Sequence, residues 1–216
     1  MRALRAFFVF ALLIGLAAPA AADAAPAQTN YAPELQAAIT QAEAYLNRIT
    51  TLHARFVQVG PNGKMAEGDL YLSRPGRMRI EYDPPVPLLL IAANDWLAYQ
   101  DKELEEVTYL PLSSTPATFL LQEKIRLGGD ITVTKAEKTP GATRIWLART
   151  DDPGAGTLAL VFSDTPFALR QWDVTDSQGL TTQVGLLNTE FGQTFDPKLF
   201  ELRNPYKKRK AGPRRR

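Results

Sequence analysis

The segment Gly-Asp-Leu-Tyr-Leu-Ser-Arg-Pro-Gly-Arg-Met-Arg-Ile-Glu-Tyr-Asp-Pro-Pro, residues 68–85, contains two short alternating runs joined by a tight turn at Arg74-Pro75-Gly76. In the second run Met78, Ile80 and Tyr82 alternate with charged residues, a period of two that is typical of a half-buried strand. The next run, Leu-Leu-Leu-Ile-Ala-Ala at 88–93, is too apolar for such alternation. One strand with a wet face followed by one that is apolar on both faces predicts a curved sheet around an apolar interior.

The N-terminus has the features of a secretory signal peptide. Two arginines precede an apolar run of 11 residues at 6–16, and Ala20-Ala21-Ala22 matches a cleavage site. An uncleaved membrane anchor would need about 20 apolar residues and a stop-transfer flank. We therefore expect a signal peptide at 1–22, with Ala25 as the alternative cleavage site, a linker at 23–30 and a periplasmic mature protein.

Cysteine content and charge placement exclude several classes of protein. The chain has no cysteine, so an ordinary core must hold the fold and no lipid is attached at a lipobox. Residues 23–206 carry 16 Lys or Arg against 23 Asp or Glu, a net charge of −7, whereas residues 207–216 carry +7. An acidic body disfavours nucleic acid as a partner. The basic tail is expected to be a disordered, solvated end, with attraction to anionic lipid as the alternative.

The hydrophobic pattern of the mature chain predicts one helix and then a long series of strands. Pro33 suits a first helical turn. An apolar stripe follows at helical spacing, formed by Leu35, Ile39, Ala42, Leu46 and Ile49. The strand candidates are Ala54–Val59, Glu67–Ser73, Arg77–Tyr82, Leu88–Ala93, Trp96–Gln100, Glu105–Leu110, Ile131–Glu137, Thr143–Ala148, Thr157–Ser163, Ala168–Thr175 and Leu180–Asn188. Their short connections favour an antiparallel meander curled toward a barrel, in one domain at 31–206.

The strand series is interrupted once, after residue 114. Thr115 is a good N-cap and Pro116 suits the first helical position. Apolar residues follow as far as Ile125, and Gly128-Gly129 is a stop signal. This short helix either plugs the open end of the barrel or is a plain crossover connection.

No constellation of residues points to an enzyme. His53 is the only histidine, and there is no Gly-x-Ser-x-Gly motif and no Gly-rich phosphate loop. Metal sites need several His or Cys ligands. Acidic pairs such as Glu105-Glu106 and Asp151-Asp152 have exposed, turn-like contexts. We predict a protein with no catalytic residue, no cofactor and no metal.

Large apolar side chains are spread over nearly every predicted element. They either fill an ordinary core or line a ligand cavity, since a barrel of eight or more strands can hold a small apolar ligand. Composition does not separate the two. The candidate cavity residues are Phe56, Leu70, Leu72, Met78, Ile80, Tyr82, Leu89, Ile91, Trp96, Phe119, Leu121 and Trp146.

Four motifs in order carry a resemblance to a known family. They are Leu-His-Ala-Arg-Phe-Val-Gln at 52–58, Gly-Asp-Leu-Tyr-Leu-Ser-Arg-Pro at 68–75, Trp-Leu-Ala-Tyr at 96–99 and Thr115-Pro116. Behind a signal peptide they resemble the periplasmic outer-membrane lipoprotein carrier family, LolA, over about residues 35–205. The resemblance implies an unclosed barrel of eleven antiparallel strands, with helices as a lid over a hydrophobic cavity.

The resemblance also implies a function and a site. Members of the family are chaperones that accept acylated lipoproteins from an inner-membrane ABC transporter and deliver them to an outer-membrane receptor lipoprotein, LolB. We expect the same partners here, and a monomer. Arg74 matches the functionally important arginine of the family, which would bond the lid helices and hold the cavity closed. The alternatives are a carrier of another amphiphile or lipid, and a lipoprotein-sensing regulatory domain of the same fold.

Overall fold

A computed structural model of the chain describes residues 31–115, 117–201 and 204–206. The predicted signal peptide (1–22), linker (23–30) and basic tail (207–216) lie outside these ranges. Within the described ranges, every helix is too short or too polar to span a lipid bilayer.

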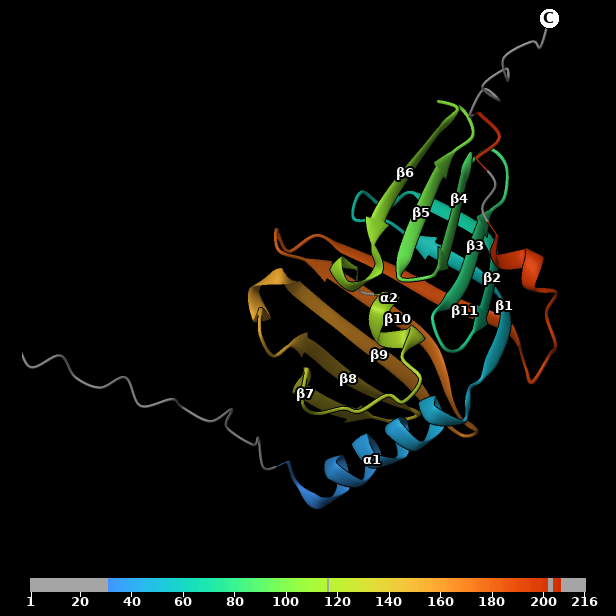
Figure 1. The fold of residues 1–216 in the computed structure, drawn as a ribbon. Coiled ribbons are helices and arrows are strands. Elements are labelled where there is room, and N and C mark those ends of the chain that lie inside the picture. The colour runs from blue at the N-terminus through green and yellow to red at the C-terminus, as the bar shows by residue number, and fades with distance from the viewer. Residues whose placement is uncertain (1–30, 116, 202–203, 207–216) are drawn as a thin grey trace, which may run out of the picture.

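One antiparallel sheet of eleven strands forms the body of the structure (Figure 1). The strands are β1 (Thr51–Val59), β2 (Met65–Ser73), β3 (Arg77–Tyr82), β4 (Leu88–Ala93), β5 (Trp96–Asp101), β6 (Glu106–Pro111), β7 (Ile131–Thr139), β8 (Ala142–Arg149), β9 (Gly156–Asp164), β10 (Phe167–Asp176) and β11 (Thr181–Phe191). Their spatial order is β6-β5-β4-β3-β2-β1-β11-β10-β9-β8-β7. Because β6 and β7 are the two edges of this order, the sheet is curled but unclosed. The predicted mainly-β, unclosed antiparallel fold is confirmed.

The register of β2 and β3 places their alternating apolar residues on one face. Leu72 pairs with Met78, and Leu70 pairs with Ile80. Directly paired residues of antiparallel strands share a face, so these four side chains all point to the concave side. Gly68 leaves room on that side for the ring of Phe56: a Cβ at this position would lie 2.7 Å from the ring and 2.1 Å from a carbonyl oxygen of β3.

Two α-helices lie on the concave side of the sheet (Figure 1). The predicted stripe of α1 (Pro33–Arg48) is buried at Ile39, Ala42 and Leu46, together with Tyr45. The short helix α2 (Ala117–Leu121) lies in the hollow between the two halves of the sheet. The remaining helical elements are single 3₁₀ turns, η1 (Leu112–Ser114), η2 (Pro153–Ala155) and η3 (Pro197–Phe200).

The inserted helix is shorter than its apolar pattern predicted. It ends at Leu121, and Ile125 lies beyond it. The side chain of Asn47 accepts a hydrogen bond from the N–H of Ile125 (2.9 Å) and donates one to its carbonyl oxygen (2.8 Å). Because these bonds satisfy both backbone groups of Ile125, that residue does not need helical hydrogen bonds. The predicted N-cap, Thr115, donates its hydroxyl backward to the carbonyl of Leu112 (2.8 Å).

The convex face of β2 to β5 is partly covered by the C-terminal segment, which the sequence pattern did not predict. Phe200 of η3 is 4% exposed, and the guanidinium of Arg77 lies 5.7 Å from the centre of its ring. Further along, Gln100 of β5 donates to the hydroxyl of Tyr206 (2.9 Å). This cover explains why β4 is apolar on both faces: the odd-numbered side chains of 88–93 face the convex side, where Ile91 meets Phe200 at a common groove.

Candidate functional site

Arg74 is held between the ends of the two α-helices. Its Nε donates to the carbonyl oxygen of Leu120 (2.7 Å), and its Nη1 donates to that of Leu46 (2.7 Å). Both acceptors belong to the last turn of a helix, where carbonyl groups lack helical partners. Two residues on, the N–H of Gly76 donates to the carbonyl of Leu121 (2.9 Å). The β2–β3 turn therefore ties α1 and α2 to the sheet.

The charge of Arg74 is balanced by carbonyl dipoles. Among the described residues no carboxylate forms an ion pair with it. Burial lowers the pKa of Arg74 to about 10, so the guanidinium is still protonated at neutral pH. The negative end of the α1 dipole stabilises a cation at this position. Because the two bonds act between separate elements, moving either helix breaks one of them.

A second set of hydrogen bonds joins α1 to the chain that follows α2. Besides the two bonds between Asn47 and Ile125, the carboxylate of Glu43 accepts the N–H of Leu127 (2.8 Å). We call α1 together with residues 112–115 and 117–127 the lid. Arg74, Asn47 and Glu43 make its parts a connected unit on the concave side of the sheet.

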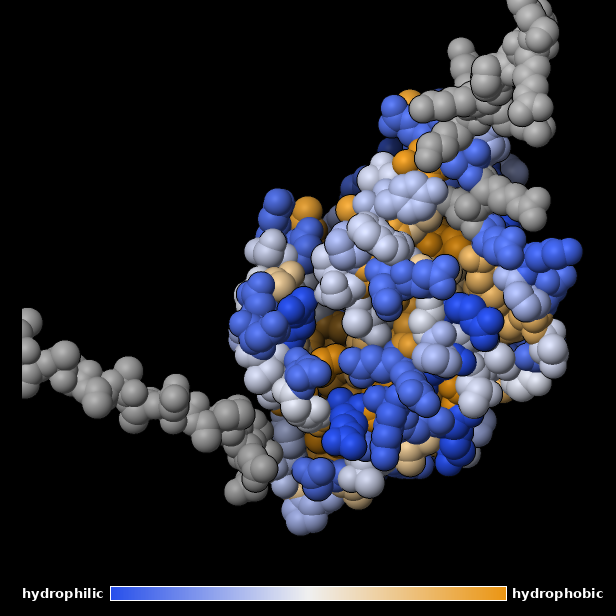
Figure 2. All heavy atoms as spheres, in the orientation of Figure 1, coloured by the Kyte–Doolittle hydropathy of each residue, from blue (hydrophilic) through white to orange (hydrophobic). Residues whose placement is uncertain are grey.

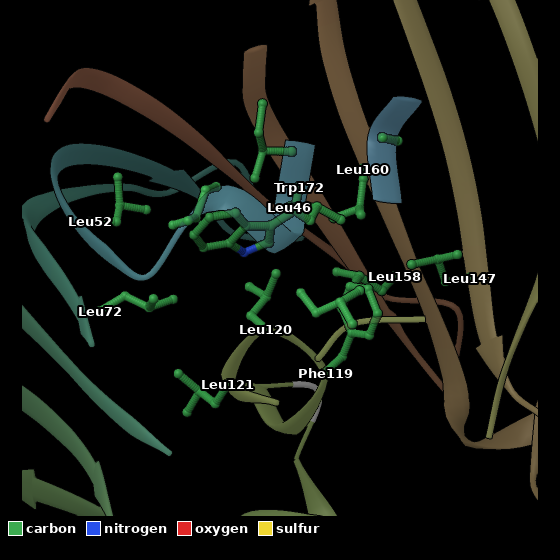
Figure 3. Close-up of a cluster of buried hydrophobic side chains, with 14 of the residues drawn as sticks. Leu46, Leu52, Leu72, Phe119, Leu120, Leu121, Leu147, Leu158, Leu160 and Trp172 are labelled. Atoms are coloured by element: carbon green, nitrogen blue, oxygen red, sulfur yellow. The ribbon is translucent and has the colours of Figure 1, made fainter. Parts of the chain in front are cut away.

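Apolar side chains of the lid fill the concave side. Phe119, Leu120 and Leu121 are 4, 8 and 2% exposed, and all three belong to the main hydrophobic cluster. In Figure 3 they point toward side chains from both halves of the sheet, among them Leu72 and Trp172. Apolar side chains are also visible in a recess framed by hydrophilic ones in Figure 2. These three side chains therefore occupy part of the apolar surface that the concave face would offer to a ligand.

Eight of the twelve candidate cavity residues gather at this site. Six come from β1, β2 and β3 and two from α2: Phe56, Leu70, Leu72, Met78, Ile80, Tyr82, Phe119 and Leu121. Tyr82 packs edge-on against Phe56, with ring centres 5.2 Å apart, and donates its hydroxyl to Gln58 (2.8 Å). Burial raises the pKa of Tyr82 above its usual value.

The other four candidates, Leu89, Ile91, Trp96 and Trp146, lie on the convex face, and their assignment to the cavity is wrong. The first three come from β4 and β5, where apolar side chains occupy both faces, so composition could not show which set faces inward. Trp146 stands between the inward residues Ile145 and Leu147 of β8. Its ring packs outside against Lys135, whose Nζ lies 4.7 Å from the ring centre.

The sequence analysis missed two polar residues of the site. Glu43 and Asn47 belong to the polar side of α1 and carry no motif. The sequence feature that could have indicated them is their spacing of four residues, because this spacing places both side chains on the same flank of the helix, beside the apolar stripe.

Comparisons with known proteins show what this chain is similar to. Residues 47–203 match the family model "Outer membrane lipoprotein carrier protein LolA". An outer-membrane lipoprotein carrier protein of Pseudomonas paraeruginosa is 28% identical over 214 residues, which cover 95% of this chain and 96% of the relative. The carrier protein of Methylococcus capsulatus is 28% identical over 172 residues, covering 76% of this chain and 82% of the relative. The crystal structure of a LolA superfamily protein from Nitrosomonas europaea aligns over 78% of this chain and 97% of that one, with 9% identity and a TM-score of 0.46.

Proposed function

Because this chain belongs to the LolA family of outer membrane lipoprotein carrier proteins, we propose that it is a periplasmic chaperone that shields the acyl chains of lipoproteins between the two membranes. It would receive them from an inner-membrane ABC transporter and deliver them to an outer-membrane receptor lipoprotein. The observation that carries the proposal is the closed lid: a connected unit of helices over a concave apolar face, fastened by one half-buried arginine.

The physical need for such a carrier is the cost of exposing acyl chains to water. Each methylene costs about 0.8 kcal/mol, so one chain of about 15 carbons costs on the order of 12 kcal/mol. An unassisted lipoprotein would therefore leave a membrane very slowly. The carrier needs no covalent step, because its task is to replace one apolar environment with another.

The packing of the lid is matched to this task. Phe119, Leu120 and Leu121 are the side chains that an acyl chain would displace, and burying each is worth about 1.5–3 kcal/mol. Their total, on the order of 5–9 kcal/mol, is smaller than the roughly 12 kcal/mol gained by sheltering one chain. Lid closure therefore opposes loading without preventing it, and it returns this part of the free energy when the cargo is released.

Arg74 acts in this proposal as the latch of the lid. In the empty protein it bonds α1 and α2, and in the loaded protein those bonds are broken as α2 moves away. The bonds recover when the cargo leaves, so they favour unloading. Arg74 thus assists hand-over to the receptor and contributes little to acceptance.

Titration with a fluorescent fatty acid tests the proposal. We expect saturable binding near one site per protein and displacement by a synthetic triacylated lipopeptide. If the fatty acid shows no saturable binding, the protein is not a carrier of acyl chains. If the fatty acid binds saturably but the lipopeptide does not displace it, the protein carries another amphiphile.

A further inference from the structure

Within the residues that the structure describes, the outer edge of β6 has backbone groups without partners. In the described chain β6 pairs only with β5. The N–H of Leu112 donates to the carbonyl of Asp95 (2.8 Å), which fixes the positions of hydrogen-bonded pairs between the two strands. Since such pairs alternate, Val107 and Tyr109 fall in non-hydrogen-bonded pairs. Their N–H and C=O groups therefore point away from β5, toward the edge.

Apart from the charged Glu106 at its start, this edge lacks the features that usually protect an edge strand. Lysines, bulges and internal prolines are the common safeguards, but the register of β6 is continuous and its proline, Pro111, stands at the end. Two apolar side chains on opposite faces of the strand, Tyr109 and Leu110, are 50 and 43% exposed. The edge therefore offers a template for an extended chain.

A groove of about 590 Å³ opens on the convex side beside this edge. Its apolar lining includes Trp96, Tyr109, Ile91 and Phe200. In a strand added to β6, the residue opposite Tyr109 would project to the same convex side. A large apolar side chain at that position could lean over Tyr109 into the groove.

The charges beside the edge specify the kind of partner. The last residue of β5, the β5–β6 turn and the first residue of β6 carry four acidic residues and a single cation, Lys102; the acidic residues are Asp101, Glu103, Glu105 and Glu106. A second copy of this chain would present the same acidic end. We propose that the β6 edge binds, by β-strand addition, an extended segment of a partner protein that has alternating apolar side chains and a basic flank.

The position of the edge connects this contact to the lid. β6 leads through η1 directly into α2, so a strand added to β6 ends beside the first residues of the lid. If the protein is the carrier proposed above, such a partner would touch the element that must move when cargo is exchanged. The binding of an extended segment itself does not depend on that function.

The test is an NMR titration of the full mature chain with a synthetic peptide of alternating valine and threonine that carries a lysine at each end. We expect saturable binding and slower hydrogen exchange at the amides of Val107 and Tyr109. Val107→Pro removes one outward N–H without touching the β5 ladder and should weaken binding about five-fold, as expected for one lost hydrogen bond. The matched control, Val107→Ala, keeps the N–H and should stay within about two-fold.

Charge reversal provides a second arm. Glu106→Lys should weaken binding of the lysine-flanked peptide, and this loss should diminish at high salt; Glu137→Lys on β7 should not weaken it.

Several outcomes would overturn the proposal. Equal binding by the proline and alanine variants would show that the edge is not used. Self-association in sedimentation that Val107→Pro abolishes would make a second copy the occupant. Markedly tighter peptide binding after deletion of residues 207–216 would make the chain's own tail the occupant.

Discussion

Replacing Arg74 with leucine should open the lid without unfolding the sheet. The side chain donates two charged hydrogen bonds, to Leu46 and Leu120, and each is worth about 1.5–3 kcal/mol. Against them stands the cost of burying the guanidinium, which lowers the pKa of Arg74 to about 10 and corresponds to about 3 kcal/mol. The net stabilisation of the closed lid is therefore on the order of 0–3 kcal/mol, and its midpoint of about 1.5 kcal/mol is a factor of about 10 in the ratio of closed to open protein.

The assay is lipoprotein transfer in two stages. Arg74→Leu should still take lipoprotein from inner-membrane vesicles, because acceptance requires the open state. It should pass that lipoprotein to the receptor more slowly, because closure no longer helps to expel the cargo. Thermal unfolding should shift by only a few degrees, since the lost bonds and the removed desolvation cost nearly cancel.

Arg74→Lys is the matched control. It keeps the charge, but a single ammonium lacks the rigid fork of donors that spans two carbonyl groups. It should therefore transfer poorly as well. Unloading by Arg74→Leu at the wild-type rate, or full rescue by lysine, would refute the latch.

Four other changes have expected outcomes. Phe119→Ala should lower the melting temperature, because truncating a buried Phe costs about 3–5 kcal/mol. It should also tighten fatty-acid binding, because the closed state loses more packing than the loaded one. The control Trp146→Ala, on the convex face, should leave the fatty-acid affinity unchanged. Asn47→Ala should accelerate hydrogen exchange at Ile125, whereas the exposed substitution Gln41→Ala should not, and identical exchange in both would separate Asn47 from the lid. Deleting residues 207–216 should reduce only binding to anionic vesicles at low salt; a large loss of fatty-acid binding would contradict this. Burial raises the pKa of Tyr45 and Tyr82 above the usual value for tyrosine. Their contribution to stability is therefore complete below pH 10 and is lost as the pH rises through their folded-state pKa values. Tyr82→Phe should reduce this alkaline loss of stability, as measured by denaturant titrations followed by tryptophan fluorescence.

The strands could be predicted from the local sequence pattern. Which side chains of each strand face the concave side could be predicted for some strands only. Where charged and apolar residues alternate, as at 77–82, the inward set is evident from sequence and the structure confirms it. In β4 both sets are apolar, because the C-terminal segment covers the convex side from about 100 residues away along the chain. That long-range contact has no local signature, and it explains the misassignment of Leu89 and Ile91.

Arg74 could be predicted as a site residue, but its hydrogen-bond acceptors could not. Arg74 was singled out by resemblance, within the turn that its sequence predicted. Its acceptors are backbone carbonyls of Leu46 and Leu120, and any residue type could supply them, so no motif reveals them. The length of α2 was overestimated for a similar reason: Asn47, which lies 78 positions from Ile125, satisfies the backbone there.

Hydrogen exchange in the empty and the loaded protein tests the central claim most directly. In this structure the amides of Gly76, Ile125 and Leu127 donate hydrogen bonds to groups of the lid. Saturation with a triacylated lipopeptide should speed exchange at all three, while amides in the β1–β2 ladder stay protected. Lipopeptide that binds without changing exchange at these three amides, or that does not bind, would contradict the account of a lid that yields to acyl chains.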